Sequence, residues 1–534
     1  MCGIFAAYGM NTHTAGTTLA HRGPDDFSSQ VVGKTRFDFW RLAINGTEEA
    51  CQPIVFSDLY LVANAEIYNF KELGGQEGES DCQVILPTVI EHGLANACHI
   101  FSGDFAFVFT DGEDVWAARD AVGVRPLFYT RPEGGGIVFA SEMKGLTHFQ
   151  TKIEIFPPGH IYDSKLDAFV CWAPMYWDCP RLDDDLEYVK DQLRDLMFKA
   201  VERRVLTSER PVGFFLSGGL DSSIVAALAQ KALGSAHKLK TFSIGLEGSP
   251  DLKAAREMAD WLKSEHHEVL FTVQEGLAAI RDVIRHTETF DTTTIRASIP
   301  MYLLSKYIKE NTNVRVVLSG EGSDELFGGY LYFHDAPNVD EFQRETMRLI
   351  RDVHMFDVLR ADRTTAAHGL ELRVPFFDRD VIDYVMDGFS PELRMPFEGY
   401  EKWLLRETFE DILPPSIAWR QKNGMSDAVG YAWADALRKY GESNYKKIFR
   451  EIFGRKNDHV VPYMWMPKWS PGAKDPSARL LPHFTDVVKP HVALKSMAVK
   501  DSQTEIEWFA KVMLGWFAVL TSVSAYIAWN GLGQ

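Results

Sequence analysis

The chain has 534 residues and a mass of 60.4 kDa, which at roughly 150 residues per domain suggests two to four domains. Apolar residues make up 46% and charged residues 24%, so disorder, collagen-like sequence and low-complexity repeats are excluded as overall descriptions. The formal charge is −18, from 56 Lys and Arg against 74 Asp and Glu. Such a chain lacks the overall attraction to phosphate that nucleic-acid-binding proteins use, so we expect no nucleic-acid partner.

The small number of cysteines and the lack of a recognisable secretory signal predict a reduced, cytoplasmic protein. Six cysteines are too few for a disulfide scaffold, and the first residues contain neither a basic nor a long apolar segment. The C-terminal run at 512–529 is uncharged and mostly apolar, and a tail anchor needs about 20 such residues. Because Ser and Thr dilute this run, we favour a helix packed in a core or an interface over a membrane tether.

Residues 1–182 are typical of a domain built on sheets. Short apolar runs alternate with Gly and Pro turns, and two stretches have helical character. The clearest predicted elements are strands at 59–63, 105–110 and 136–139 and a helix at 81–92. This mixture predicts an α+β domain, and Pro180 with the acidic residues 183–185 marks its end.

Residues 188–484 have a different pattern, in which short apolar runs alternate with helices. A helix is predicted at 188–205, and strands are predicted at 212–216, 241–246, 268–272 and 314–318. This alternation predicts a parallel sheet with helices on both faces. Ligands of such sheets bind beyond the carboxyl ends of the strands. From about residue 352 to 440 we expect mainly helices.

Polar residues of the first region fit the hydrolysis of a glutamine amide. If the initiator Met is removed, the Cys2 thiol lies beside a free α-amino group that can accept its proton, although a buried apolar role is also open. Asn64 can offer its amide to an oxyanion, and Arg41 can grip a carboxylate. Glu66 and Asp81 can accept an ammonium group. Each of these polar residues could instead serve a turn or a helix cap.

The segment Ser217-Gly-Gly-Leu-Asp-Ser222 follows a predicted strand and precedes a helix predicted at 224–233. Its glycines allow close backbone approach, and a helix N-terminus favours an anion, so it predicts a phosphate-binding loop. It is not a Walker A loop, because no Gly-Lys-Ser/Thr ends it. Asp221 in such a loop fits a divalent cation that bridges to a nucleotide.

A second strand ends in Ser319-Gly-Glu-Gly-Ser-Asp-Glu325, which predicts a substrate and metal site at the same sheet edge, with a solvated acidic loop as the alternative. Lys422 would supply positive charge for a leaving pyrophosphate.

Several motifs together resemble known families. Cys2–Phe5, His21–Asp25 and Asn64–Asn69, with Arg119–Tyr129 and Ser141–Lys144, resemble class II glutamine amidotransferases. The phosphate loop resembles that of the ATP-pyrophosphatase domain of glutamine-hydrolysing asparagine synthetases. Further segments that resemble this family are Gly248–Ala255, Thr292–Ser298, Glu371–Asp378, Trp419–Asp427 and Asp475–Arg479. The resemblance covers residues 2–484, and the extension 485–534 has no counterpart.

The resemblance implies an Ntn-hydrolase-type αββα sandwich at 1–182 and an α/β parallel-sheet ATP-pyrophosphatase domain at 188–484. It also implies that Cys2 hydrolyses glutamine to glutamate and ammonia. ATP would activate aspartate as β-aspartyl-AMP, and ammonia would attack it to give asparagine, AMP and pyrophosphate. The implied partners are the small molecules glutamine, aspartate and ATP, with Mg²⁺ as cofactor and a second copy of the chain in a homodimer.

Site residues follow from the resemblance position by position. Ala65 stands where the family usually has Gly, and its backbone N–H is expected to join Asn64 in the oxyanion hole. Glu321 is the expected base for the proton that the attacking ammonia loses. ATP and pyrophosphate contacts are expected from Leu216, Ser217, Gly218, Gly219, Asp221, Ser222, Ile244, Ser319, Gly320 and Lys422. Contacts to aspartate are expected from Thr293 and Arg296, and contacts to magnesium from Asp221 and Asp324.

Two alternatives remain open on sequence alone. The same two domains could serve a different acceptor carboxylate, such as a peptide or a sugar acid, although the Gly248–Ala255 and Thr292–Ser298 segments argue against it. A degenerate paralogue could bind nucleotide or a membrane partner without catalysis, which the presence of Cys2, Asp221 and Glu321 argues against. Ala65 also leaves room for an enzyme that prefers free ammonia.

Overall fold

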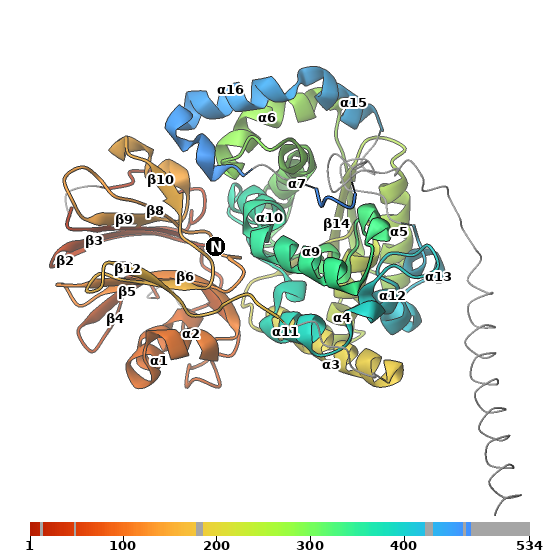
Figure 1. Ribbon diagram of the computed structural model, residues 1–534, viewed down its shortest axis with the longest axis horizontal. Coiled ribbons are helices and arrows are strands. Elements are labelled where there is room, and N and C mark those ends of the chain that lie inside the picture. The colour runs from red at the N-terminus through yellow and green to blue at the C-terminus, as the bar shows by residue number, and fades with distance from the viewer. Residues whose placement is uncertain (11–13, 47–49, 178–184, 422–430, 463–465, 471–534) are drawn as a thin grey trace, which may run out of the picture. The chain divides into compact units, whose positions relative to one another are not determined.

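The computed structural model describes residues 1–10, 14–46, 50–177, 185–421, 431–462 and 466–470. The N-terminal half (1–177) contains two six-stranded antiparallel sheets, which Figure 1 shows stacked on one another. The first has the order β10-β8-β9-β1-β3-β2, with β1 (Gly3–Tyr8), β2 (Asp26–Val32), β3 (Thr35–Arg41), β8 (Phe128–Thr130), β9 (Ile137–Ala140) and β10 (Ile153–Ile155). The second has the order β12-β11-β7-β6-β5-β4, with β4 (Ile54–Phe56), β5 (Leu59–Ile67), β6 (Gly103–Thr110), β7 (Val115–Arg119), β11 (His160–Asp163) and β12 (Ala168–Cys171).

The alternation of side chains along the strands explains this stacking. On β5, Val62 packs into one core with Ile4 and Ala6 of β1, between the sheets. Its neighbours Leu61 and Ala63 point the other way, into a core with α1 (Ile85–His92) and α2 (Leu94–Ile100). The opposite outer face carries the short turns η2 (Met143–Gly145) and η3 (Thr147–Phe149). The predicted sandwich is confirmed.

The C-terminal half (185–470) is built on a five-stranded parallel sheet with the order β15-β14-β13-β16-β17. Its strands are β13 (Val212–Phe215), β14 (Lys240–Gly245), β15 (Glu265–Leu270), β16 (Val316–Leu318) and β17 (Glu371–Arg373). The helices around it are α3 (Leu186–Leu206), α4 (Leu220–Leu233), α5 (Pro250–Leu262), α6 (Val273–Thr287), α7 (Thr292–Asn311), α8 (Ser323–Phe327), α9 (Val339–Asp352), α10 (Asp357–Ala366), α11 (Arg379–Asp387), α12 (Trp403–Phe409), α13 (Pro415–Ala418), α15 (Tyr431–Tyr440) and α16 (Glu442–Phe453). The predicted parallel sheet is confirmed.

The strand order places the two predicted ligand loops side by side. The chain runs outward from β13 to β14 and β15, and then returns to form β16 on the other side of β13. At such a switch point the loops after the two neighbouring strands diverge and leave a crevice for a ligand. The phosphate loop follows β13, and the Ser319–Glu325 segment follows β16. The topology therefore brings together motifs that lie about a hundred residues apart in sequence.

Some predicted boundaries need correction. The helix after the phosphate loop begins at Leu220 rather than at 224, because Gly219 is its N-cap, so Asp221 and Ser222 lie in its first turn. The strand expected at 268–272 lies at 265–270, since the chain already enters α6 after Thr272. The proposed boundary at 182–188 stays a prediction.

The C-terminal extension at 485–534 and its apolar run lie outside the described residues. Among the residues that are described, no helix has both the length and the apolar character that a membrane crossing requires.

Buried ions join the two halves. Arg22 of the N-terminal half is fully buried and binds the Asp362 carboxylate of α10 with both terminal guanidinium nitrogens, at 2.9 and 3.1 Å. The same guanidinium donates to Glu142 Oε1 at 2.6 Å and to the backbone carbonyl of Cys2 at 3.1 Å. The Arg22 guanidinium thus connects the N-terminal strand to the far half of the molecule.

A second set of contacts extends this network. Glu288, at the end of α6, accepts backbone N–H groups of Met143 and Lys144, each at 2.8 Å. Arg363 of α10 lies 3.3 Å from Glu142 and 3.4 Å from Glu288. Although burial alone would raise it, the pKa of Glu142 is held well below its ordinary value by Lys144 and the surrounding cations. The matched motif segments 21–25 and 141–144 therefore serve the interface between the halves.

Replacing Arg22 with Ala would leave the carboxylates of Glu142 and Asp362 buried with one cation fewer. Breaking a buried ion pair in this way costs about 3–5 kcal/mol. We expect Arg22→Ala to lower the urea midpoint of unfolding strongly. Lys34→Ala is the matched control, because the Lys34–Glu113 pair is solvent-exposed and such pairs contribute little. Similar midpoints for the two variants would contradict the role of the buried network.

Candidate active sites

Cys2 lies where the two sheets and the C-terminal half meet, next to the N-terminus marked in Figure 1. The Leu42 backbone N–H approaches its Sγ at 3.5 Å, just beyond the end of β3. Burial raises the pKa of this thiol, and the carboxylates of Glu66 and Glu371 raise it further. The thiol therefore needs a nearby base before it can act as a nucleophile.

The residue before Cys2 occupies the adjoining space. Met1 is 2% exposed, and its side chain belongs to the core that also contains Val124 and Leu216. The Met1 α-ammonium lies 3.0 Å from Glu371 Oε2, and both groups are buried. An amine at this end of the chain thus has a carboxylate partner from the C-terminal half.

Four polar side chains, three of them predicted, gather near Cys2. Arg41, at the end of β3, contacts the backbone oxygens of Asn45 and Gly46 at 3.5 and 3.3 Å. The Asn45 side chain donates to Glu66 Oε2 at 3.3 Å. Asp81, next to its helix N-cap Ser80, accepts the Ile67 backbone N–H at 2.7 Å. The structure thus brings together a guanidinium and two carboxylates, the groups that would bind the two charged ends of an amino acid.

Asn64 has the properties expected of an oxyanion donor. It is fully buried on β5, and neither its amide nitrogen nor its carbonyl oxygen has a hydrogen-bond partner among the described residues. A buried polar group without a partner is costly, so its presence points to a ligand that supplies one.

Ala65 is accommodated without backbone strain. It lies within β5, and its methyl group packs on the helix side with the core that contains Cys82 and Val84. Asn64 and Glu66 lie on the opposite face of the strand. The structure therefore places the methyl group away from the two neighbouring site residues.

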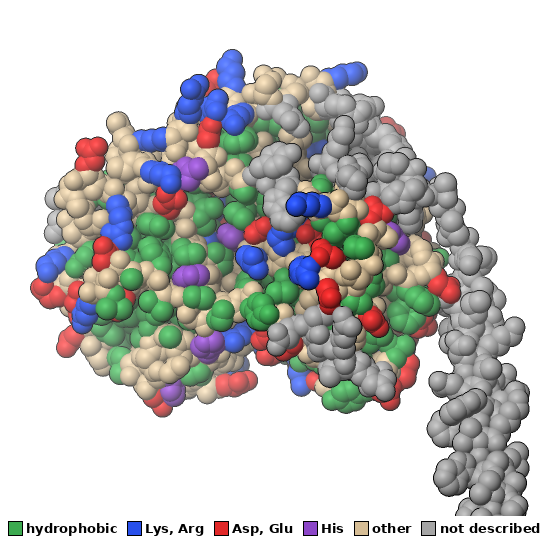
Figure 2. All heavy atoms as spheres, in the orientation of Figure 1, with side chains coloured by type: hydrophobic (Ala, Val, Ile, Leu, Met, Phe, Trp, Pro, Cys, Tyr) green, Lys and Arg blue, Asp and Glu red, His purple; other side chains and the backbone are tan. Residues whose placement is uncertain are grey.

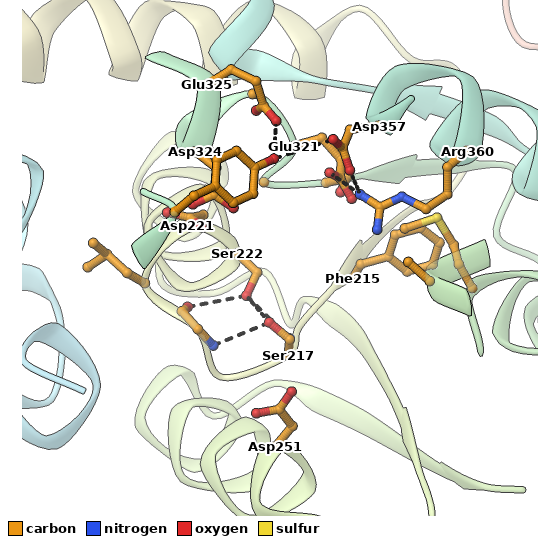
Figure 3. A pocket seen from close by; sticks show the side chains of 18 of the residues that line it. Phe215, Ser217, Asp221, Ser222, Asp251, Glu321, Asp324, Glu325, Asp357 and Arg360 are labelled. Atoms are coloured by element: carbon orange, nitrogen blue, oxygen red, sulfur yellow. Dashed lines mark hydrogen bonds and ion pairs between the residues drawn. The ribbon is translucent and has the colours of Figure 1, made fainter. Parts of the chain in front are cut away.

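The second candidate site is a cavity of about 260 Å³ at the carboxyl edge of the parallel sheet (Figure 3). It is lined by both predicted loops and by α7 and α10. Among the described residues that line it are the predicted Leu216, Ser217, Gly219, Asp221, Ser222, Ile244, Thr293, Ser319, Gly320, Glu321 and Asp324. Gly218 and Arg296 are not among those lining residues, and Lys422 lies outside the described residues.

The phosphate loop is held closely by its neighbours. Gly218 has φ +69°, and a Cβ there would come within 2.4 Å of the α5 backbone at Ala254. Gly320 of the second loop is equally constrained, because its Cβ would lie 2.8 Å from the Asp221 backbone. Ser222 Oγ meets Ser217 Oγ at 3.1 Å within the loop (Figure 3). The two glycines thus let the two loops and α5 pack together around the N-terminus of α4.

Glu321 lines the cavity next to a buried arginine. Figure 3 shows it beside Arg360 of α10, whose Nη2 donates to Glu321 Oε2 at 2.6 Å and to Asp357 Oδ1 at 2.6 Å. Burial and the nearby carboxylates, opposed by Arg360, raise the pKa of Glu321 to about 7. A carboxyl group with such a pKa can accept or release a proton at neutral pH.

The two residues predicted to bind magnesium, Asp221 and Asp324, both contact the ammonium group of Lys402. Lys402 Nζ lies 2.7 Å from both oxygens of Asp221 and 2.5 Å from Asp324 Oδ1. Although burial opposes it, these two carboxylates raise the pKa of Lys402. Two carboxylates together with phosphate oxygens are a donor set that suits Mg²⁺. The described residues contain no group of three or more acidic, His or Cys side chains arranged to hold a metal without such a ligand.

Three cationic residues of this site were not singled out from the sequence. Lys402 and Arg360 lie on segments with no phosphate-binding pattern of their own. Arg420 belongs to a matched motif, and it donates to the Gly218 carbonyl at 3.1 Å and to Asp251 Oδ1 at 2.6 Å. The two loops contain several carboxylates, and buried carboxylates need cations nearby. This excess of negative charge in the sequence could have indicated that further basic residues complete the site.

Comparison with known proteins decides the family. Residues 1–161 match a glutamine amidotransferase domain, and residues 192–342 and 334–453 match asparagine synthase. The glutamine-hydrolysing asparagine synthetase of Homo sapiens is 41% identical over 564 residues, which cover 92% of this chain and 100% of the relative. The chain belongs to the asparagine synthetase family. The relatives from Cricetulus griseus and Gallus gallus are 42% and 40% identical with the same coverage. We therefore call the N-terminal half the amidotransferase half and the C-terminal half the synthetase half.

The carboxylates near Cys2 predict a pH dependence. Burial raises the pKa of Asp81 to about 6, and below that pH its neutral carboxyl cannot pair with an ammonium group. We expect kcat/KM for glutamate release from glutamine to fall as the pH drops through about 6. The profile is measured between pH 5 and 8 for the wild type and for Asp81→Asn, which should lose this inflection. An unchanged inflection in Asp81→Asn would refute the assignment.

Lys402 should be essential at the second site. Lys402→Gln leaves Asp221 and Asp324 facing each other without the ammonium, so AMP formation should fall by about 100-fold or more. Glutamate release should change little, because Cys2 lies in the other half. Lys231→Gln is the control, since Lys231 is an exposed residue at the far end of α4, the helix whose first turn contains Asp221. Retention of AMP formation by a folded Lys402→Gln variant would disprove this role.

Proposed function

We propose that this protein makes asparagine from aspartate, with glutamine as the nitrogen donor and ATP as the energy source. One observation carries the proposal: a terminal thiol site and a sheet-edge phosphate loop lie in one folded unit, joined by one continuous core. Relatives that share the whole arrangement bear the name glutamine-hydrolysing asparagine synthetase.

In the amidotransferase half, the first step is attack of Cys2 Sγ on the glutamine carboxamide. Removal of Met1 would free the Cys2 amine, which takes the thiol proton and passes it to the leaving ammonia. Arg41 would hold the substrate's carboxylate, and Glu66 and Asp81 its ammonium. The Asn64 amide and the Ala65 backbone N–H would stabilise the oxyanion. Water then releases glutamate from the thioester.

Ammonia has to reach the second site as the neutral molecule, because ammonium has no lone pair for attack. The core around Cys2 contains Met1, Leu42 and Val124 of the amidotransferase half, and it continues into Leu216 and Leu220 beside the phosphate loop. An apolar environment disfavours the protonated form of an amine. This continuity supports the transfer of ammonia inside the protein.

In the synthetase half, the aspartate β-carboxylate attacks the α-phosphorus of ATP, and pyrophosphate leaves. Ser217 to Ser222 and the N-terminus of α4 would bind the phosphates, with Lys402 and Lys422 as cations. Asp221 and Asp324 would hold Mg²⁺, which neutralises phosphate charge when it is bound. Thr293 and Arg296 are the proposed aspartate contacts. Glu321 would accept the proton that ammonia loses as it attacks the acyl adenylate.

Expectations on assembly and location also stay proposals. Figure 2 shows acidic, basic and apolar side chains interspersed over one face of the molecule. The proposed homodimer rests on the family resemblance, and the proposed cytoplasmic location rests on the sparse cysteines and the character of the first residues. Ala65 lies in an unstrained strand position, which supports the use of glutamine as the nitrogen donor.

A product assay tests the function. Wild-type protein with glutamine, aspartate, ATP and Mg²⁺ should yield asparagine, AMP and pyrophosphate. Cys2→Ala should reduce asparagine formation from glutamine by about 10³-fold or more and leave formation from ammonium close to wild type. Cys51→Ala, at a partly buried thiol elsewhere in the same half, is the control. ADP instead of AMP, no dependence on aspartate, or full glutamine use by Cys2→Ala would each contradict the proposal.

A further inference from the structure

Arg373 of the synthetase half reaches into the candidate glutamine site. It ends β17 and is fully buried. Its Nη2 donates to Glu66 Oε2 at 2.7 Å, and its Nε donates to Glu371 Oε1 at 2.8 Å. Glu66 lies on β5 of the amidotransferase half. One guanidinium therefore joins a candidate substrate-binding carboxylate to the sheet of the other half.

Rigid elements aim this guanidinium. Its Nη1 donates to the Arg204 carbonyl at 2.7 Å and to Thr207 Oγ1 at 3.0 Å, at the C-terminal end of α3. The Arg373 backbone is fixed as well, because its carbonyl accepts the Ser319 N–H at 3.1 Å next to the phosphate site. These contacts occupy three of the five N–H groups, on Nε and Nη1, and so fix the plane of the guanidinium. The remaining nitrogen, Nη2, faces the Glu66 carboxylate.

The local charges make this contact important. Burial and the carboxylates of Glu371 and Asp81 raise the pKa of Glu66 well above its ordinary value, and Arg373 opposes that shift. An ammonium group pairs with a carboxylate and not with a neutral carboxyl group. Positive charge from Arg373 and from the substrate ammonium therefore both favour the ionised form of Glu66, which is the form that binds the ammonium. Arg373 supplies the fixed cation and holds the Glu66 carboxylate through its Oε2 atom.

We propose that Arg373 is a positioning residue of the glutamine site, which orients the Glu66 carboxylate to receive the α-ammonium of glutamine. This inference rests on the proposed function, because it takes Glu66 as an ammonium acceptor. It adds that the glutamine site is completed by the synthetase half. Recognition of the amino acid then depends on correct docking of the two halves.

Comparing two substrates isolates this role. Glutaramate is glutamine without the α-amino group, so it cannot use the ammonium acceptor. Arg373→Lys keeps the positive charge but loses the fork. We expect this variant to raise KM for glutamine by about tenfold with little change in kcat, and to leave the kinetics of glutaramate hydrolysis unchanged. The ratio of kcat/KM for glutamine to that for glutaramate should therefore fall by about tenfold. A general structural defect would lower both values together.

Arg204→Lys is the matched control. Arg204 is equally buried between the halves, but it pairs with Asp378 at 2.5 Å and lies 3.7 Å from Asp104. Its substitution should leave the substrate ratio at the wild-type value. Ammonium-dependent asparagine formation, measured for both variants, reports whether the synthetase half is folded. If Arg373→Lys does not fold, Thr207→Val removes one acceptor of the fork and should lower the ratio in the same direction, to a smaller extent.

The outcomes separate this inference from the function. A folded Arg373→Lys variant with the wild-type substrate ratio, or one that loses both substrates equally, would overturn the role of Arg373 alone. A wild-type protein that releases no glutamate from glutamine would overturn the proposed function and this inference with it. A fall in the ratio for Arg373→Lys with a constant ratio for Arg204→Lys would support it.

Discussion

Water does not reach Arg22 and Arg373, two charged side chains through which the two halves of the chain meet. Arg22 and Arg373 bind carboxylates across the boundary, and each of them is fully buried. An ion that loses its partner inside a protein costs several kcal/mol, so any docking that separates these pairs is strongly disfavoured. Planar guanidinium–carboxylate pairs also fix the direction in which the two surfaces face each other. The ion pairs thus select one relative placement of the two candidate sites.

That single placement matters for the chemistry because the two sites exchange an intermediate. The thiol site lies at the boundary itself, and the phosphate loop follows β13, which β16 separates from the boundary strand β17. The backbone that carries Arg373 also holds Ser319, so elements of both sites share one rigid strand pair. Precise positions of catalytic groups require this kind of support, because small displacements lower reaction rates greatly. The interface is therefore part of both sites.

The sequence predicts those features that depend on local pattern. Alternation of strands and helices predicts the parallel sheet, and the loop after β13 predicts the phosphate site because glycines and hydroxyls stand together in one segment. The prediction of the two-sheet sandwich comes from the resemblance to a known family. Lys402 and Arg360 escape this reasoning, since each is an ordinary basic residue on its own segment and becomes a site residue through folding. Arg22 and Arg373 lie within recognisable motifs, but the motif does not say that their partners are in the other half. Local sequence patterns do not predict which buried charged residues pair with one another across the two halves.

Burial of Met1 has a consequence for the timing of biosynthesis. In the folded chain this side chain is enclosed by both halves, and its amine is paired with Glu371. An aminopeptidase has to bind a free, extended chain end, which the closed molecule does not offer. If Cys2 is to act through its own amine, the methionine has to be removed before the two halves fold together. Removal during synthesis, while the synthetase half is still incomplete, meets this requirement. The fraction of mature protein then depends on whether removal of the methionine is faster than folding.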